Sequence, residues 1–145
     1  MTTPTPNAPN ELGVGRPTKR RPGPAAGGLP VADSRPTLVN GLVTGVRCIS
    51  CRYSSPQSGQ PWCPVCYAEL KPDSFGPGGT IWSSTVVGIP VGTREAPFAL
   101  AYVDLDDGPR VLVHLSEAAT LPIDTRVTII GTDEGDLVAS EGELA

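Results

Sequence analysis

Residues 47–66 read RCISCRYSSPQSGQPWCPVC and hold all four cysteines of the chain, as two C-x2-C pairs separated by eleven residues. One such pair can present two sulfurs to one ion, and two pairs facing each other complete the tetrahedron that zinc prefers. Four thiolates leave no coordination position open, so the ion would be structural and not catalytic. The sequence therefore predicts one structural Zn2+ per chain. Its ligands are Cys48, Cys51, Cys63 and Cys66.

Two other uses of these four sulfurs stay open. A rubredoxin-type iron centre has the same ligands, and a pair of thiols can exchange with a disulfide. No thioredoxin-like βαβ pattern surrounds either pair, which counts against redox exchange. Zinc contributes on the order of 10 kcal/mol to the folding of such a peptide, so we expect the ribbon to unfold without metal.

The apolar stretch LVNGLVTGV at residues 38–46 leads directly into the first cysteine pair. Gly41 and Gly45 disfavour a helix there, so we expect a short extended segment or a hairpin. It either covers the ribbon, which has almost no core of its own, or docks on a partner, and we favour the covering role. The ribbon is predicted to span 38–71, and the Pro and Gly residues of 72–79 predict a linker.

From residue 80 onward the apolar pattern is that of β-strands, rich in β-branched residues and alternating with period two. Asp106-Asp107-Gly108-Pro109 suits a tight turn, and residues 116–119 are expected to form one helical turn. Five strands with a short helix after the third suggest an OB-fold barrel in residues 80–145, ending in an acidic tail. The predicted strands are 80–87, 98–105, 110–115, 126–131 and 137–139.

Residues 1–37 contain eight prolines and show no apolar periodicity, so we expect a disordered arm. The basic cluster within it could contact an acidic partner or RNA, although a solvated tail is the plainer interpretation. The cluster consists of Arg16, Lys19, Arg20 and Arg21.

The formal charge of -4 is unevenly distributed, with +3 in residues 1–37, +2 in 38–71 and -9 in 72–145. The strongly negative residues 72–145 repel phosphate backbones, so we expect no nucleic acid to bind to this part of the chain. The chain has no run of 18 apolar residues and no secretory pattern at its N-terminus, so we expect a cytoplasmic protein without a membrane partner. In that reducing compartment, paired cysteines indicate a metal before they indicate disulfides.

Few other residues suggest chemistry. His114 is the only histidine and is predicted on the strand face opposite Val111 and Val113, as a surface or contact residue. Three aspartates near residue 106 could bind a hard cation, but we expect them to lie in a solvated turn. Without a P-loop, a G-x-S-x-G or an H-E-x-x-H motif, the sequence predicts no enzyme. The aspartates are Asp104, Asp106 and Asp107, and the aromatics that could stack on a base or pack in the barrel are Trp82 and Tyr102.

A four-cysteine ribbon followed by a five-strand barrel resembles a family of acyl-CoA-associated proteins that accompany thiolase-like enzymes. These proteins combine a rubredoxin-like zinc ribbon with an OB-fold and were formerly described as a domain of unknown function. The resemblance runs over about residues 46–139 and is carried by R-C-x-x-C at 47–51, C-P-x-C at 63–66, GTIWSSTVV at 79–87 and FALAYVDLDDG at 98–108. The two strand segments are more specific than the cysteines, because zinc ribbons are widespread.

The resemblance implies a non-catalytic subunit that binds a thiolase, aldolase, synthase or hydratase and helps form its acyl-CoA channel. The chain departs from the family where Arg52 and Tyr67 follow the cysteine pairs in place of the usual glycine. A proline-rich arm and residues 38–46 also replace the helix that often precedes the ribbon. Coenzyme A phosphates would need basic groups. The candidates outside the arm are Arg47, Arg52, Arg94 and Arg110.

Two other function classes fit the sequence less well than the accessory role. Zinc ribbons and OB-folds also occur in modules that bind RNA or single-stranded DNA, but the acidic barrel and the seven aromatic residues argue against one here. A self-sufficient hydratase would need paired catalytic groups that the sequence does not offer.

Overall fold

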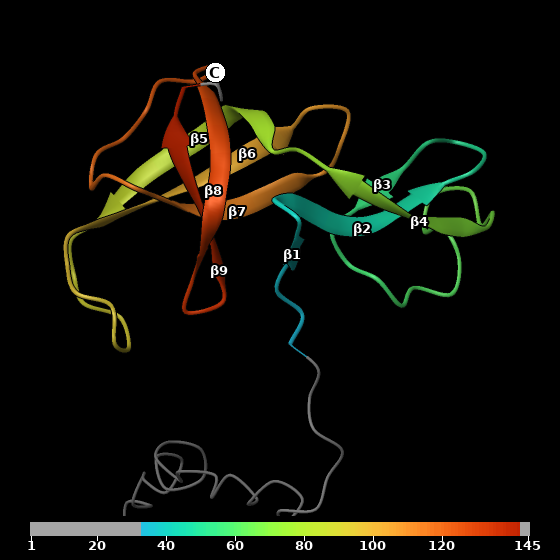
Figure 1. Cartoon of the computed structure of the whole chain (residues 1–145), viewed down its shortest axis with the longest axis horizontal. Coiled ribbons are helices and arrows are strands. Elements are labelled where there is room, and N and C mark those ends of the chain that lie inside the picture. Colours follow the sequence, from blue (N-terminus) through green and yellow to red (C-terminus); the bar gives the residue numbers. More distant parts are fainter. Residues whose placement is uncertain (1–32, 143–145) are drawn as a thin grey trace, which may run out of the picture. The chain divides into compact units, whose positions relative to one another are not determined.

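The computed structural model describes residues 33–142, and the arm predicted for residues 1–37 lies mostly outside them. Within this range every regular element is a β-strand, so the predicted all-β class is confirmed (Figure 1). No helix long and apolar enough to cross a bilayer occurs among the described residues.

The ribbon is built on a small sheet with β2 at its centre. The four strands are β1 (Leu38–Val39), β2 (Leu42–Cys48), β3 (Ser54–Ser55) and β4 (Leu70–Phe75). Asn40 and Gly41 join β1 to β2 and both have positive φ, 53° and 77°. An Asn-Gly pair with two positive φ angles is the favoured two-residue hairpin connection, which accounts for the hairpin expected at residues 38–46.

β4 pairs with β2 over six residues, from Val43 opposite Phe75 to Cys48 opposite Leu70. The stretch 72–79, predicted as a linker, is therefore almost entirely strand: only Gly76 and Pro77 separate β4 from β5. Pro72 suggested a break, but β4 is an edge strand, where a proline is tolerated.

Five further strands close into a barrel in the order β5-β6-β7-β9-β8, with β8 returning to β5. β7 and β9 run parallel, and the other pairs are antiparallel. The predicted five-strand OB-type barrel is thereby confirmed, and the bounds expected for β6 and β7 match those observed. The strands are β5 (Gly78–Val87), β6 (Phe98–Leu105), β7 (Arg110–Leu115), β8 (Arg126–Asp133) and β9 (Asp136–Glu141).

The helical turn predicted at residues 116–119 was wrong. The backbone there bends without forming a helix. The amide of Ser116 donates to the carbonyl of Ala139 in β9, at 2.9 Å, so the chain stays attached to the sheet after β7 ends. The amide of Ala119 donates to the carbonyl of Glu117, only two residues back, at 2.9 Å, which is not the i→i−4 bond of a helix.

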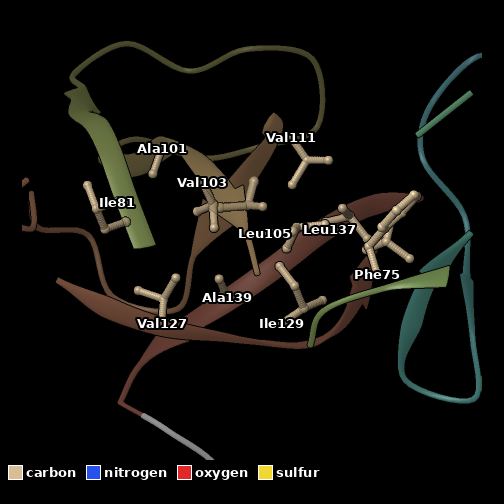
Figure 2. Close-up of a cluster of buried hydrophobic side chains, with 12 residues drawn as sticks. Phe75, Ile81, Ala101, Val103, Leu105, Val111, Val127, Ile129, Leu137 and Ala139 are labelled. Atoms are coloured by element: carbon tan, nitrogen blue, oxygen red, sulfur yellow. The ribbon is translucent and has the colours of Figure 1, made fainter. Parts of the chain in front are cut away.

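The barrel interior is filled by inward-facing side chains of its own strands, joined by two residues of the ribbon sheet (Figure 2). Val43 of β2 is fully buried, and Phe75 of β4 is 3% exposed. Phe75 packs so closely on Gly108 that a Cβ added there would lie 2.9 Å from its ring. Residues 38–46 thus take part in the core. The cluster comprises Val43, Phe75, Ile81, Ala101, Val103, Leu105, Val111, Val113, Val127, Ile129, Leu137 and Ala139.

Candidate functional site

The structure brings the four cysteine sulfurs together. Cys48 Sγ lies 3.4 Å from Cys66 Sγ, and Cys51 Sγ lies 3.6 Å from Cys63 Sγ. All four sulfurs are within 4.8 Å of one another. Four zinc–sulfur bonds of about 2.3 Å in a tetrahedron place the sulfurs about 3.8 Å apart. The cluster therefore has the size and donor chemistry of a site that could hold one metal ion.

Backbone amides point at the sulfurs, as expected of loops that stabilise thiolates. The amides of Ser50 and Cys51 donate to Cys48 Sγ at 3.4 and 3.5 Å, and the amide of Val65 donates to Cys63 Sγ at 3.4 Å. Burial alone would raise the pKa of the Cys48 thiol, but the amide and thiol donors around it lower that pKa from 9.0 to about 6. The amides thus favour the charged form of Cys48. At Cys51 the opposing effect of the Tyr53 amide is outweighed by burial and the neighbouring thiols, which raise the pKa of that thiol to about 12.

The two departures from the family pattern at the cysteine pairs have a structural consequence. Arg52 and Tyr67, which follow the two pairs directly, both have φ of 64°. A left-handed backbone is costly for residues with a Cβ and is the reason that glycine is favoured at such positions. The amide of Tyr67 still donates to the carbonyl of Cys63 at 2.9 Å, so the loop keeps its turn despite the cost.

The three aspartates considered for a hard cation do not converge. Asp104 is 2.7 Å from Arg110, Asp106 is 2.6 Å from Arg126, and Asp107 is 3.6 Å from Arg47. The Arg126 guanidinium holds the pKa of Asp106 below its usual value. Each carboxylate is thus balanced by a guanidinium, and these residues serve as ion pairs at the barrel end.

The four arginines proposed for coenzyme A phosphates all face aspartates. Arg47 contacts Asp73 at 2.8 Å, and Arg52 lies 3.7 Å from Asp107. Arg94 is 3.4 Å from Asp133, while Arg110 pairs with Asp104. Of the four, Arg52 has the most exposed side chain, at 68%. A phosphate would have to displace a carboxylate at each of the others.

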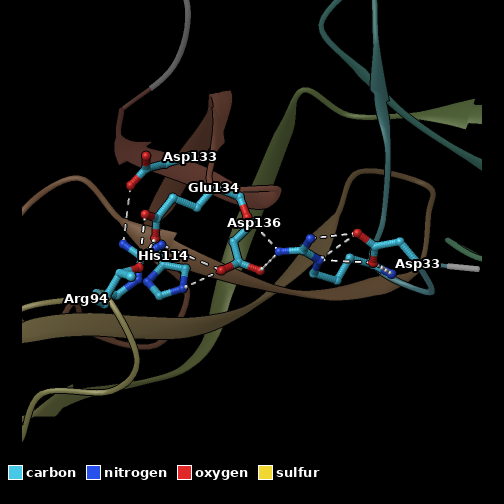
Figure 3. A network of polar contacts seen from close by, with 8 residues as sticks. Asp33, Arg94, His114, Asp133, Glu134 and Asp136 are labelled. Carbon is cyan, nitrogen blue, oxygen red and sulfur yellow. Dashed lines mark hydrogen bonds and ion pairs between the residues drawn. The ribbon is translucent and has the colours of Figure 1, made fainter. Parts of the chain in front are cut away.

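His114 lies in a polar network that the sequence did not reveal (Figure 3). Its Nε2 is 3.3 Å from Asp136, whose carboxylate also lies 3.6 Å from Arg94. Burial and the nearby Arg94 lower the pKa of His114, against the opposing effect of Asp136. The face expected for His114 is correct, since Val111 and Val113 point inward, yet the side chain is only 13% exposed.

Loops distant in sequence enclose His114. Thr93 of the β5–β6 loop bonds to Glu134 in the β8–β9 turn, and Arg94 of the same loop bonds to Asp133 at the end of β8. Arg35 donates to the Glu134 carbonyl at 2.7 Å. We name this set of contacts the clasp. Its partners are about forty to a hundred residues apart in the chain, so no local sequence pattern could have identified it.

Trp82 and Tyr102 project from the outside of the barrel and are not packed inside it. Their exposed fractions are 47% and 45%, and their rings meet edge to face with centroids 6.0 Å apart. The Arg110 guanidinium carbon lies 3.9 Å from the Trp82 ring centroid.

Comparisons with known proteins agree with this architecture. Residues 74–132 match the family described as ChsH2, C-terminal OB-fold domain. Among solved structures, the chain is similar to one described as "Ltp2-ChsH2(DUF35) aldolase", with a TM-score of 0.55 and 23% identity over 69% of this chain and 84% of that one. A search of curated proteins gives no match. These findings agree with the resemblance predicted from the sequence: residues 74–132 match a C-terminal OB-fold domain of the ChsH2 type, and the similar solved structure shares the fold.

Proposed function

We propose that this chain is a non-catalytic accessory subunit that binds a thiolase-superfamily enzyme and helps form its acyl-CoA binding or channelling site. The observation that carries the proposal is the ChsH2-type OB-fold of residues 74–132, preceded directly by a four-cysteine ribbon. The similar solved structure is an aldolase that combines ChsH2 with Ltp2. An OB-fold chain that works beside an enzyme is the role that this likeness supports.

We propose that the four sulfurs hold one structural Zn2+. The ligands would be Cys48, Cys51, Cys63 and Cys66, whose spacing fits tetrahedral sulfur coordination. Four sulfurs leave no position for a substrate, so the ion would supply folding energy and no catalysis. Metal analysis of freshly purified protein tests this, and a rubredoxin-type centre would instead show iron.

We propose a structural role for His114. Its Nε2 faces Asp136 and its ring lies 5.6 Å from that of Phe98, where it helps to hold the clasp. Among the described residues, its charged partner is Asp136, which Arg94 also contacts, and Arg94 in turn pairs with Asp133. General acid-base catalysis would need a titrating group free to reach a substrate.

We propose that the barrel forms part of the wall of the acyl-CoA site and that the partner enzyme supplies most phosphate contacts. The candidate arginines of this chain already meet aspartates, so little of their charge is available to a phosphate. A protein of this role would be expected in the cytoplasm, without nucleic acid or membrane as a partner.

The test is reconstitution with the full chain. Tagged protein should co-purify with a thiolase-superfamily enzyme, and removing the chain should lower that enzyme's turnover of acyl-CoA while the chain alone turns over none. Nucleic-acid binding is the competing function. Binding of RNA or single-stranded DNA at ~50 mM salt that weakens steeply as salt rises would support it and overturn the accessory role.

A further inference from the structure

An apolar groove crosses the outer face of the barrel over β5, β6 and β7. It consists of two hollows, of about 260 and 600 Å3, that share Leu100 and Leu112. Tyr102 pairs with Leu112 across β6 and β7, and Leu112 is 47% exposed. We name this surface the outer-face groove. It is an exposed apolar surface of the kind that proteins present to partners.

An aromatic platform adjoins the smaller hollow through Tyr102, which lines it, and is held in place before any partner arrives. Trp82 is packed edge to face against Tyr102 and is covered on one side by Arg110, which Asp104 fixes at 2.7 Å. Rigid, half-exposed aromatic side chains dominate the binding energy of protein interfaces, because they bury a large area at little entropic cost.

The other end of the groove is the clasp, where two arginines, Arg35 and Arg94, lie among four carboxylates, those of Asp33, Asp133, Glu134 and Asp136. Asp136 is surrounded by His114, Arg94 and Arg35 (Figure 3). The Glu134 carboxylate, which also lines the larger hollow, accepts hydrogen bonds from the Thr93 hydroxyl at 3.1 Å. Among residues 33–142 no cationic side chain pairs with that carboxylate. The clasp end of the groove therefore attracts a cation and repels a phosphate, because the Glu134 carboxylate has no cationic partner in the described part of the chain.

We infer that the outer-face groove is the surface on which the thiolase-superfamily partner docks, through an apolar segment whose Lys or Arg pairs with Glu134. The inference rests on the proposed function and adds to it the contact surface and the chemistry of the partner segment. The apolar floor supplies the affinity, and the unmatched carboxylate fixes the orientation of the segment.

The central test replaces Leu112 in the full chain and measures the affinity for the purified thiolase-superfamily enzyme. Leu112→Asp places a charge in the middle of the groove and should weaken binding about thirtyfold, as for a hot spot. Leu112→Thr keeps strand propensity and should weaken it about fivefold. The matched control is Ile130→Asp on β8, because Ile130 is a 56% exposed aliphatic side chain that does not line the groove. It should bind like the wild type.

The charge of the partner segment is tested at Glu134. Glu134→Lys should weaken binding about tenfold at low salt, and the difference from wild type should shrink as salt screens the pair. Glu134→Gln, which keeps the shape and the contact with Thr93, should show a smaller loss with the same salt dependence. Tighter binding by Glu134→Lys would mean an acidic partner segment and would overturn this part of the inference.

The possible failures can be told apart. If the wild-type chain binds a thiolase-superfamily enzyme and both Leu112 variants bind it equally well, the docking surface is elsewhere while the accessory role stands. If the wild type binds no such enzyme, the proposed function fails and the inference fails with it. A wild-type dimer that only Leu112→Asp dissociates, with enzyme binding unchanged, would assign the groove to a second copy and overturn the proposal.

Discussion

The ribbon and the barrel are stabilised in different ways. Between residues 47 and 69 only Cys48, Ser55 and Cys63 are buried, and two of these are sulfur donors. In the barrel, ten strand residues form a continuous apolar core. The ribbon thus depends on its metal and the barrel on apolar burial. Phe75 and Arg47 connect the two regions, and the predictions below separate these contributions in order of expected effect.

Loss of the metal should have the largest effect. Cys51→Ser, or chelation of the wild type, should remove on the order of 10 kcal/mol from the folding of the ribbon. Hydrogen exchange should then become fast over residues 47–69 and stay slow in β6 and β7. Ser50→Ala, which changes a side chain between two ligands, is the control and should keep its metal. Slow exchange in the metal-free ribbon would show that the proposed dependence is wrong.

Phe75→Ala should break the apolar link between the regions. Phe75 belongs to the ribbon sheet but is 3% exposed within the barrel cluster, so its loss should cost about 3–5 kcal/mol. Ile81→Val, a truncation within the barrel alone, should cost about 1 kcal/mol.

The two tryptophans allow the unfolding of the ribbon and of the barrel to be measured separately, because Trp62 lies in the ribbon loop and Trp82 in the barrel. Urea unfolding of Trp62→Phe and Trp82→Phe backgrounds reports each region separately. We expect coincident transitions with Phe75 present and separate transitions in Phe75→Ala. If the ribbon and the barrel unfold at the same urea concentration with Phe75 and also in Phe75→Ala, Phe75 does not couple the two regions.

The polar link should contribute less. Arg47 of β2 is 16% exposed, donates to Asp73 at 2.8 Å and also donates to the backbone carbonyl of Asp107 in the β6–β7 turn. Arg47→Met keeps most of the packing and should lower the free energy of unfolding by about 1–2 kcal/mol. The control, Arg110→Met, breaks an exposed pair within the barrel and should cost about 0.5 kcal/mol. Equal losses in the two variants would contradict a bridging role for Arg47.

The same contrast explains what the sequence could predict. Strands β6 and β7 alternate buried and exposed residues, so their bounds followed from the pattern. The cysteine cluster followed from ligand spacing. The predicted linker was wrong because pairing of β4 with β2 overrode the local proline and glycine signal. The predicted helical turn was wrong because the amide of Ala119 bonds two residues back, to Glu117. The clasp and the Arg47 bridge depend on contacts between distant loops, which no periodicity encodes.

A smaller effect of opposite sign is expected at Tyr67. The residue is 76% exposed and has φ of 64°, so Tyr67→Gly should relieve backbone strain and stabilise the ribbon by about 0.5–1 kcal/mol. Tyr67→Ala removes the same ring without relieving the strain and is the matched control. The midpoint of ribbon unfolding, followed through Trp62, should rise for glycine only. A rise for both would assign the effect to the ring.

The smallest effect concerns pH in the barrel. Arg126 donates to both oxygens of Asp106 at 2.6 Å and joins the end of β6 to β8. Because the pKa of Asp106 is lowered in the folded protein, its stabilisation is present above the unfolded pKa of about 4 and is lost as pH falls through the folded pKa.

Both side chains of this pair are more than a third exposed, so screening by solvent keeps the loss small. Followed through Trp82, the barrel of Asp106→Asn should be slightly less stable than wild type at neutral pH, and the two should converge in acid. A difference that persists at about pH 2, below the usual aspartate range, would show that the carboxylate does not act through its charge.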